Sequence, residues 1–268
     1  MNWSVLDLTI LGPALIAGVL VTATHVPLGQ RVLQRGIIFL DLAVAQIAAL
    51  GLIVAYSFDW EPGGWQVQLI AMSSAVLGVL ILNYTEQRWP EIQEALIGSL
   101  FILASSGSIL LLATNPHGGE QLKELLIGQI LWVSYQQLLP VLILYVVILG
   151  VWFTLIHRIT SLHFYLLFAL AITASVQIVG VYLVFATLIF PALAIRNIER
   201  FKLIYGYVIG VTGYLAGLFF AAILDMPAGA MIVYSLTLSA FIIGWALTKR
   251  EKLGSGSISR KDAAGIKH

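Results

Sequence analysis

Two polar residues, Asp41 and Gln46, interrupt the apolar stretch GIIFLDLAVAQIAALGL. Ionisable groups within such stretches are costly to bury and mark candidate functional sites. Asp41 is interpreted either as a carboxylate for cation transfer or helix packing, or as a group that caps or snorkels near its helix end. Gln46 is a candidate metal contact or an interhelical hydrogen-bonding residue. A straight helix turns about 500° over five residues, so the pair share a face only if the helix has a bulge.

Four histidines in the body of the chain lack the spacing of a metal-binding motif such as H-E-x-x-H. His117, in the turn NPHGGE, is either a contact for an arriving cation or docking partner, or an ordinary loop residue. His25 and His157 are expected at the membrane interface near helix ends, and His163 is expected to be structural. Asp225, in LDMPAG, is expected either to stabilise the N-terminus of the last helix or to lie at an entrance.

A third candidate functional group is a charged cluster that follows an apolar run, in IVGVYLVFATLIFPALAIRNIERF (178–201). The run reaches Pro191 and then the charged residues Arg196, Glu199 and Arg200. This pattern is typical of a membrane helix that presents a short polar helix at its end, although the basic residues could serve as a topology anchor alone. The chain has no G-x-x-x-x-G-K-[ST] loop, so any ATP that powers it must bind to another chain. No nucleophile–base–acid set supports a membrane enzyme.

The composition predicts that the elements carrying these residues are transmembrane helices. The 268 residues are 60% hydrophobic and 10% charged, with a mean hydropathy of +0.96. Soluble domains carry about 25% charged residues, so the fold class is an all-α polytopic transmembrane bundle. The absence of cysteine excludes disulfides, thiol catalysis and cysteine metal sites. The first ten residues carry no Lys or Arg, so the first apolar stretch is expected to remain as a span.

A span needs about 20 apolar residues, and eight stretches qualify. They are Leu8–Val26, Ile37–Phe58, Val67–Tyr84, Ala95–Thr114, Leu138–Ile156, the block His163–Ile195, Leu203–Leu224 and Met231–Leu247. The block is too long for one crossing, because a helix of its 33 residues would measure about 50 Å. Either two short crossings that turn near Gln177–Gly180 or a broken, re-entrant pair would fit. Two crossings bring the total to nine.

The basic residues predict the orientation of these nine crossings, because Lys and Arg concentrate on the cytoplasmic side. With the N-terminus outside and the C-terminus inside, 13 of the 14 basic residues are cytoplasmic and only Lys123 is outside. The outside segment 115–137 has helical apolar spacing and is expected to form an amphipathic helix at the surface. We therefore expect a permease domain at 1–248 and a polar, Gly/Ser-rich cytoplasmic tail at 249–268 that is disordered.

The order of these motifs resembles a known family. The run VGVYLVFATLIFPALAIRNI, the later turn Asp225–Gly229 within GLFFAAILDMPAGAMIV, the outer segment LKELLIGQILWVS and the Asp41-led helix are similar to the membrane permease subunits of zinc and manganese ABC importers, the ABC-3 family. In the outer segment, Ile127-Gly128 stands where the family has a Phe-Gly pair. The similarity runs from about residue 9 to residue 248.

The resemblance implies a permease that forms the translocation pathway for a divalent cation in the cytoplasmic (inner) membrane. It implies a homodimer that binds no cofactor of its own, two copies of a separate ATPase that binds ATP and Mg²⁺, a metal-binding protein outside, and no nucleic acid. The docking segment for the ATPase is expected at Ala192–Arg200, with the candidate contacts Pro191, Ala192, Arg196, Asn197, Glu199 and Arg200. The alternatives are a secondary transporter, or an ABC permease for a non-metal or metal-complex substrate.

One departure from the family concerns the cation itself. Many members carry a histidine four residues after the helix aspartate, where this chain has Ala45; an alignment counted back from Gly51 places that histidine at Gln46. In both alignments the imidazole is missing. Zn²⁺ favours imidazole ligands, so the sequence argues against high-affinity zinc binding in the pore.

Overall fold

The computed structural model describes residues 8–56, 58, 60, 64–113, 118–155, 160–198 and 200–264. Within these ranges every regular element is a helix, which confirms the predicted all-α class. In chain order the helices are α1 (Leu8–Arg35), α2 (Leu40–Tyr56), α3 (Trp65–Arg88), η2 (Pro90–Ile92), α4 (Gln93–Leu112), α5 (Gly118–Ile127), η3 (Ile130–Trp132), α6 (Tyr135–Leu155), α7 (Ser161–Val179), α8 (Val181–Ala194), α9 (Lys202–Leu224) and α10 (Ala228–Ala264).

Seven of the described helices are long and apolar enough to cross a membrane, and α2 and α8 are shorter apolar helices. Large apolar side chains lie exposed on the outer helices, including Leu110 (74%) on α4 and Phe241 (72%) on α10. Such surfaces suit contact with lipid or with a second membrane chain. The chain is therefore a polytopic helical membrane protein, whereas the number of crossings and their orientation stay predictions.

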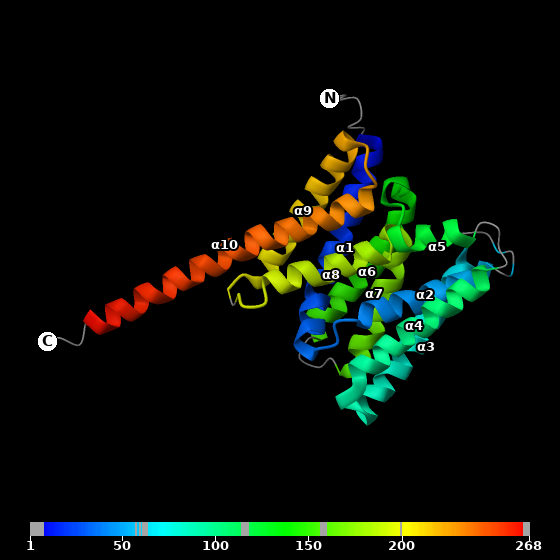
Figure 1. The fold of residues 1–268 in the computed structure, drawn as a ribbon, viewed down its shortest axis with the longest axis horizontal. Helices are drawn as coiled ribbons and strands as arrows, with labels where there is room; N and C mark the ends of the chain where they lie inside the picture. The colour runs from blue at the N-terminus through cyan, green and yellow to red at the C-terminus, as the bar shows by residue number, and fades with distance from the viewer. Residues whose placement is uncertain are drawn as a thin grey trace.

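The helices form two groups that meet along α1, α7 and α8 (Figure 1). In one group α2 packs against α3 and α4; in the other, α9 packs against α10 and α1, and α8 lies against α1 and α10. The largest apolar cluster of the interior draws on α1, α2, α3, α6, α7 and α8. Both groups thus share one core.

The long apolar block breaks where a glycine permits it. Gly180 separates α7 from α8 with φ +82° and ψ 162°, a conformation that residues with a side chain essentially never adopt. The predicted turn near Gln177–Gly180 is thus confirmed. The two helices that result have 19 and 14 residues, because α7 begins at Ser161, before the predicted block; within the block itself Gly180 lies close to the middle.

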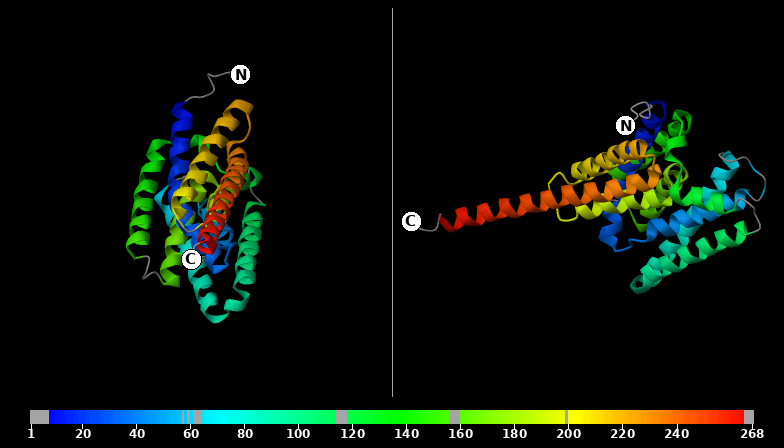
Figure 2. Two further views of the ribbon diagram at one scale, coloured as in Figure 1. Left: turned by 90° about the vertical axis from the view of Figure 1, so that its left-hand side faces the viewer. Right: turned by 45° about the horizontal axis from the view of Figure 1, so that its top comes forward.

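Two helices extend beyond their predicted ends. α1 continues past Val26 through Pro27 to Arg35, although Gln30 and Arg31 lower its hydropathy. α10 continues past Leu247 to Ala264, where the composition had predicted irregular chain, and Figure 2 shows this end projecting away from the bundle. The boundary between membrane domain and tail at residue 249 stays a prediction.

Candidate functional site

Asp41 lies in the first turn of α2 and is only 1% exposed. Neither carboxylate oxygen makes a hydrogen bond of good geometry among the described residues, although the backbone amides of Asp41 and Leu42 lie close enough to interact with the carboxylate. A carboxylate without a partner at this depth is costly, because burial removes its hydration. Asp41 therefore does not snorkel to the surface, whereas its roles as a helix cap and as a cation contact both stay predictions.

Gln46 is also 1% exposed, but it does not share a face with Asp41. α2 is a regular α-helix from Leu40 to Tyr56 and has no bulge. The five-residue spacing therefore separates the two side chains by about 140° around the axis. Both are buried nevertheless, because α2 has neighbours on several sides: α3, α4, α7 and α8.

Ala45, one of the two positions that align with the family's histidine, is closely packed. Ala45 is 1% exposed and belongs to the main apolar cluster. In the described part of the chain no three His, Cys, Asp or Glu side chains are grouped so as to hold a metal ion. His117, the remaining candidate metal contact, lies outside the described residues.

His25 corrects an expectation, since it is fully buried among the helices and does not lie near a helix end. The prediction placed the end of the first span at Val26, whereas α1 continues to Arg35 and leaves His25 well within it. Its Nδ1 lies 2.9 Å from the Val21 carbonyl oxygen and 3.0 Å from the Thr24 hydroxyl, while Nε2 has no described partner.

Sequence reasoning missed a set of buried hydroxyl groups that connects several helices. Tyr145 of α6 bonds Ser175 of α7, and the hydroxyls of Thr187 on α8 and Tyr214 on α9 lie 2.9 Å apart. The ring of Tyr214 lies against Gly18, where a Cβ would overlap it. Single hydroxyls in apolar runs give little sequence signal, because Ser and Thr also satisfy themselves on their own helix, as Ser175 does with the Ala171 carbonyl at 2.7 Å.

The end of α8 carries the residues predicted to contact an ATPase. The helix does not end at Pro191, which lies inside it, but at Ala194, and the Ile195 amide donates to the Pro191 carbonyl at 3.2 Å. The described residues after Ala194 form turns, so the short polar helix expected there is absent from them. Glu199 lies outside the described residues.

Side chains in this turn segment point in two directions. Ile195 (0% exposed) and Ile198 (4%) are buried in a small apolar cluster with α1, α9 and α10. Arg196, Asn197 and Arg200 are exposed. Lys202 donates to the Arg196 carbonyl at 3.2 Å. Two buried anchors thus hold a loop whose polar side chains face outward.

Three glycines from separate sequence motifs meet at the opposite end of α8. Gly128, which follows α5 with φ +75°, lies against the backbone of Val179 and Gly180, so that a Cβ on Gly128 would come within 2.6 Å of the Gly180 nitrogen. A Cβ on Gly229 would come within 2.7 Å of the Ile127 carbonyl oxygen. The segment after α5 is therefore fixed between the α7–α8 break and the start of α10.

Asp225 occupies the turn between α9 and α10, and its expected role at the N-terminus of α10 or at an entrance stays a prediction. It is exposed and ends α9 in the left-handed conformation, with φ 52° and ψ 47°. Its amide donates to the Ala221 carbonyl, as does the amide of Met226 at 3.1 Å. The residue therefore terminates α9.

The long and short apolar helices define the class of the protein, a polytopic helical membrane protein. The chain belongs to the ABC 3 transport family, whose model matches residues 7–164 and 154–247. These two matches cover nearly the whole membrane part of the chain.

Similar proteins agree with this family. The manganese transport system membrane protein MntC of Halalkalibacterium halodurans is 27% identical over 254 residues, covering 85% of this chain and 84% of that protein. Among solved structures, PsaBC from Streptococcus pneumoniae in complex with Fab has a TM-score of 0.71 at 19% identity, covering 87% of this chain and 90% of that one. An inward-facing structure of a metal-chelate type ABC transporter has a TM-score of 0.62 at 18% identity, covering 88% and 85%. At these identities, the two similarities to solved structures show a shared fold.

Proposed function

We propose that this chain is the membrane permease subunit of an ATP-driven importer for a divalent metal cation, located in the cytoplasmic membrane. Family membership and the similarity to a manganese transport protein support the class. The observation that carries the proposal is Asp41, a carboxylate that is 1% exposed and lacks a partner among the described residues. An ionisable group buried within a membrane helix is by default a candidate for an ion pathway.

The ligand chemistry favours manganese over zinc. The candidate contacts Asp41 and Gln46, on different sides of α2, offer oxygen ligands, and the imidazole that the family resemblance would place at position 45 or 46 is absent. Carboxylate and amide oxygens suit Mn²⁺, whereas Zn²⁺ favours imidazole and thiolate. His117 would make the first contact outside. A metal complex is the alternative cargo, since a chelated ion needs fewer ligands from the protein.

Transport through this site requires movement of helices. Asp41 is closed off within one chain by the helices around α2, so a cation reaches it only when these helices separate. In our proposal two permease copies form the pathway, a binding protein outside delivers the cation, and two ATPase subunits drive the separation. The ATPase docks on Ala192–Arg200, where Arg196, Asn197 and Arg200 are exposed and Ile195 and Ile198 are buried anchors.

The test compares two carboxylate-to-amide changes in cells that contain the complete transporter. Asp41→Asn should reduce manganese uptake by about tenfold or more while membrane abundance stays the same, because loss of a ligand exceeds the usual effect of losing its outer partner. Asp225→Asn, at the exposed turn before α10, should leave uptake unchanged. Equal loss of uptake and abundance in Asp41→Asn would assign Asp41 a structural role.

A second measurement concerns the cargo and the energy source. Cellular Mn, Zn, Fe and Co contents with and without the protein should differ mainly in manganese. If the purified chain alone moved a cation in liposomes along a proton or sodium gradient, the protein would be a secondary transporter and the ATP-driven assignment would fail.

A further inference from the structure

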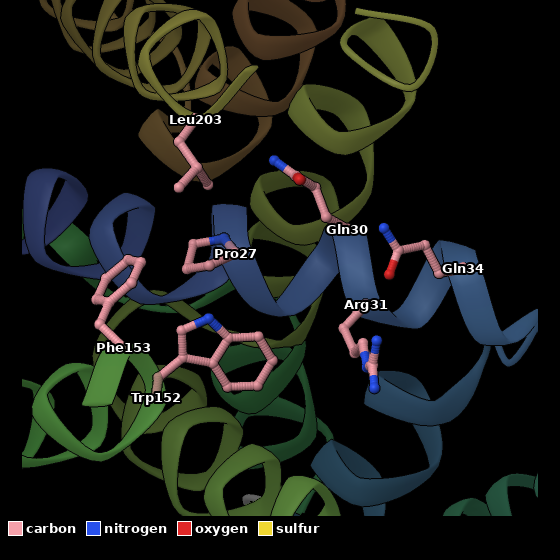
Figure 3. Close-up of a pocket in the computed structure, with 7 residues that line it drawn as sticks. All are labelled: Pro27, Gln30, Arg31, Gln34, Trp152, Phe153 and Leu203. Carbon is pink, nitrogen blue, oxygen red and sulfur yellow. The ribbon is translucent and has the colours of Figure 1, made fainter. Parts of the chain in front are cut away.

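A cavity of about 140 Å³ lies between α1, α6 and the first turn of α9. Its lining residues are Pro27, Gln30, Arg31, Gln34, Trp152, Phe153 and Leu203. The four residues from α1 have the spacing i, i+3, i+4 and i+7, so they occupy one face of that helix. Figure 3 shows Arg31 on the same side of α1 as Trp152, with Leu203 on the opposite side.

The polar lining consists of Gln30, Arg31 and Gln34, and it includes a buried donor without a partner among the described residues. Gln30 Nε2 is shielded from solvent and makes no hydrogen bond. Arg31 has no acidic side chain within salt-bridge distance among the described residues, unlike Arg35, which lies 3.6 Å from Glu86. Arg31 is the one ionisable residue among the described residues that line the cavity. A group with acceptor oxygens and a negative charge matches this lining.

We propose that this cavity binds the phosphate of an anionic phospholipid. The remaining lining is apolar, and the exposed apolar side chains Leu139, Leu142, Val146 and Phe153 continue from the cavity along α6, where acyl chains would lie. Trp152 is buried against Phe164 and forms part of the cavity wall. Basic pockets between membrane helices bind lipid headgroups in this manner. One positive charge beside an apolar surface fits a lipid phosphate better than a free phosphate ion, which prefers several cations.

The occupant would lie where α1 meets the first turn of α9, two helices that also pack against each other along their length. Arg31 belongs to α1, and Leu203 lies three residues after the segment Ala192–Arg200. A lipid held between them would stabilise the position of the first turn of α9. This inference depends on the cavity and its charge, and it stands whether or not the chain carries a metal.

The experiment measures lipid selectivity of the purified full-length protein by native mass spectrometry. The protein is released from micelles with equal amounts of phosphatidylglycerol and phosphatidylcholine, and retained lipids of each kind are counted. Wild type should retain phosphatidylglycerol in preference. Arg31→Gln should lower that preference about fivefold, which corresponds to about 1 kcal/mol per basic residue at a membrane surface. Arg31→Lys keeps the charge and should retain the preference.

The matched control is Arg88→Gln, which removes an exposed basic residue from the end of α3, outside the cavity. It should bind lipid as wild type does. An unchanged preference in Arg31→Gln, or an equal loss in Arg88→Gln, would overturn the proposal. So would displacement of phosphatidylglycerol by millimolar inorganic phosphate, which would identify a site for the free ion. A photoreactive phosphatidylglycerol should label the peptide containing Trp152 and Phe153, and absence of that adduct would also contradict it.

Discussion

The two ends of α8 are held in different ways. Just before its first residue, Val181, the contact is between backbone atoms: Gly180 lies against Gly128, and both have positive φ values. At its last residue, Ala194, the chain turns into a segment whose polar side chains are exposed and whose anchors are the side chains Ile195 and Ile198. One end is thus fixed by geometry that only glycine permits, and the other by apolar burial.

This difference indicates where α8 can move. A backbone contact between two glycines leaves no side chain that could adopt another rotamer, so displacement of either segment displaces both. Apolar anchors tolerate small shifts, because buried isoleucines lose contact gradually. A force applied at the exposed end would therefore turn α8 about its fixed end. Between the two ends, α8 lies close to α1, where Gly29 meets the Leu188 carbonyl.

The largest effect is expected from Gly180→Ala at the fixed end. The alanine would adopt a conformation that is essentially restricted to glycine, at a cost of about 1–3 kcal/mol, and its Cβ would overlap the backbone of Gly128. We expect a clear loss of folded protein in detergent, measured by thermal unfolding and size-exclusion chromatography. Gly98→Ala on α4, where a Cβ meets nothing within 4 Å, is the control and should be neutral or slightly stabilising. Normal stability of Gly180→Ala would disprove that this end is rigid.

A smaller effect on the fold, but a large one on assembly, is expected at the exposed end. Arg196→Glu combined with Arg200→Glu should reduce association with the ATPase by about tenfold or more, because like charges opposed across an interface cost several kcal/mol. Membrane insertion and thermal stability should stay normal, since both side chains are exposed. Co-purification of the two subunits measures association. If it is unchanged, the ATPase does not dock on this segment.

Much of this difference between the two ends of α8 could be predicted from the sequence, because residues close together in the chain determine it. The excessive length of the apolar block required a break, and Gly180 was the residue near its middle that could supply one. The polar exit after Pro191 was visible as a change from apolar to charged residues. Asp41 was identified because a carboxylate within an apolar stretch is unusual in any membrane helix.

The remaining features depend on tertiary contacts that a single sequence does not contain. Gly128, Gly180 and Gly229 belong to separate motifs, and nothing in their spacing indicates that they meet. His25 was placed at an interface because Gln30 and Arg31 lower the hydropathy after it, whereas these residues continue the helix along a cavity. The turn after Ala194 was expected as a short polar helix because charged residues follow the apolar run, but burial of Ile195 and Ile198 determines its path.

The smallest effect is expected from Lys202→Ala. This variant tests whether Lys202 or the buried isoleucines position the docking segment. Lys202 donates to the Arg196 carbonyl at 3.2 Å, but this bond is exposed, so its loss should change stability by no more than about 0.5 kcal/mol. Backbone bonds also hold the turn, including the Ile198 amide to the Ile195 carbonyl at 3.1 Å. ATPase association should therefore change less than about twofold, within the same energy range. A loss as large as that of the double charge reversal would mean that Lys202, and not the buried isoleucines, positions the docking segment.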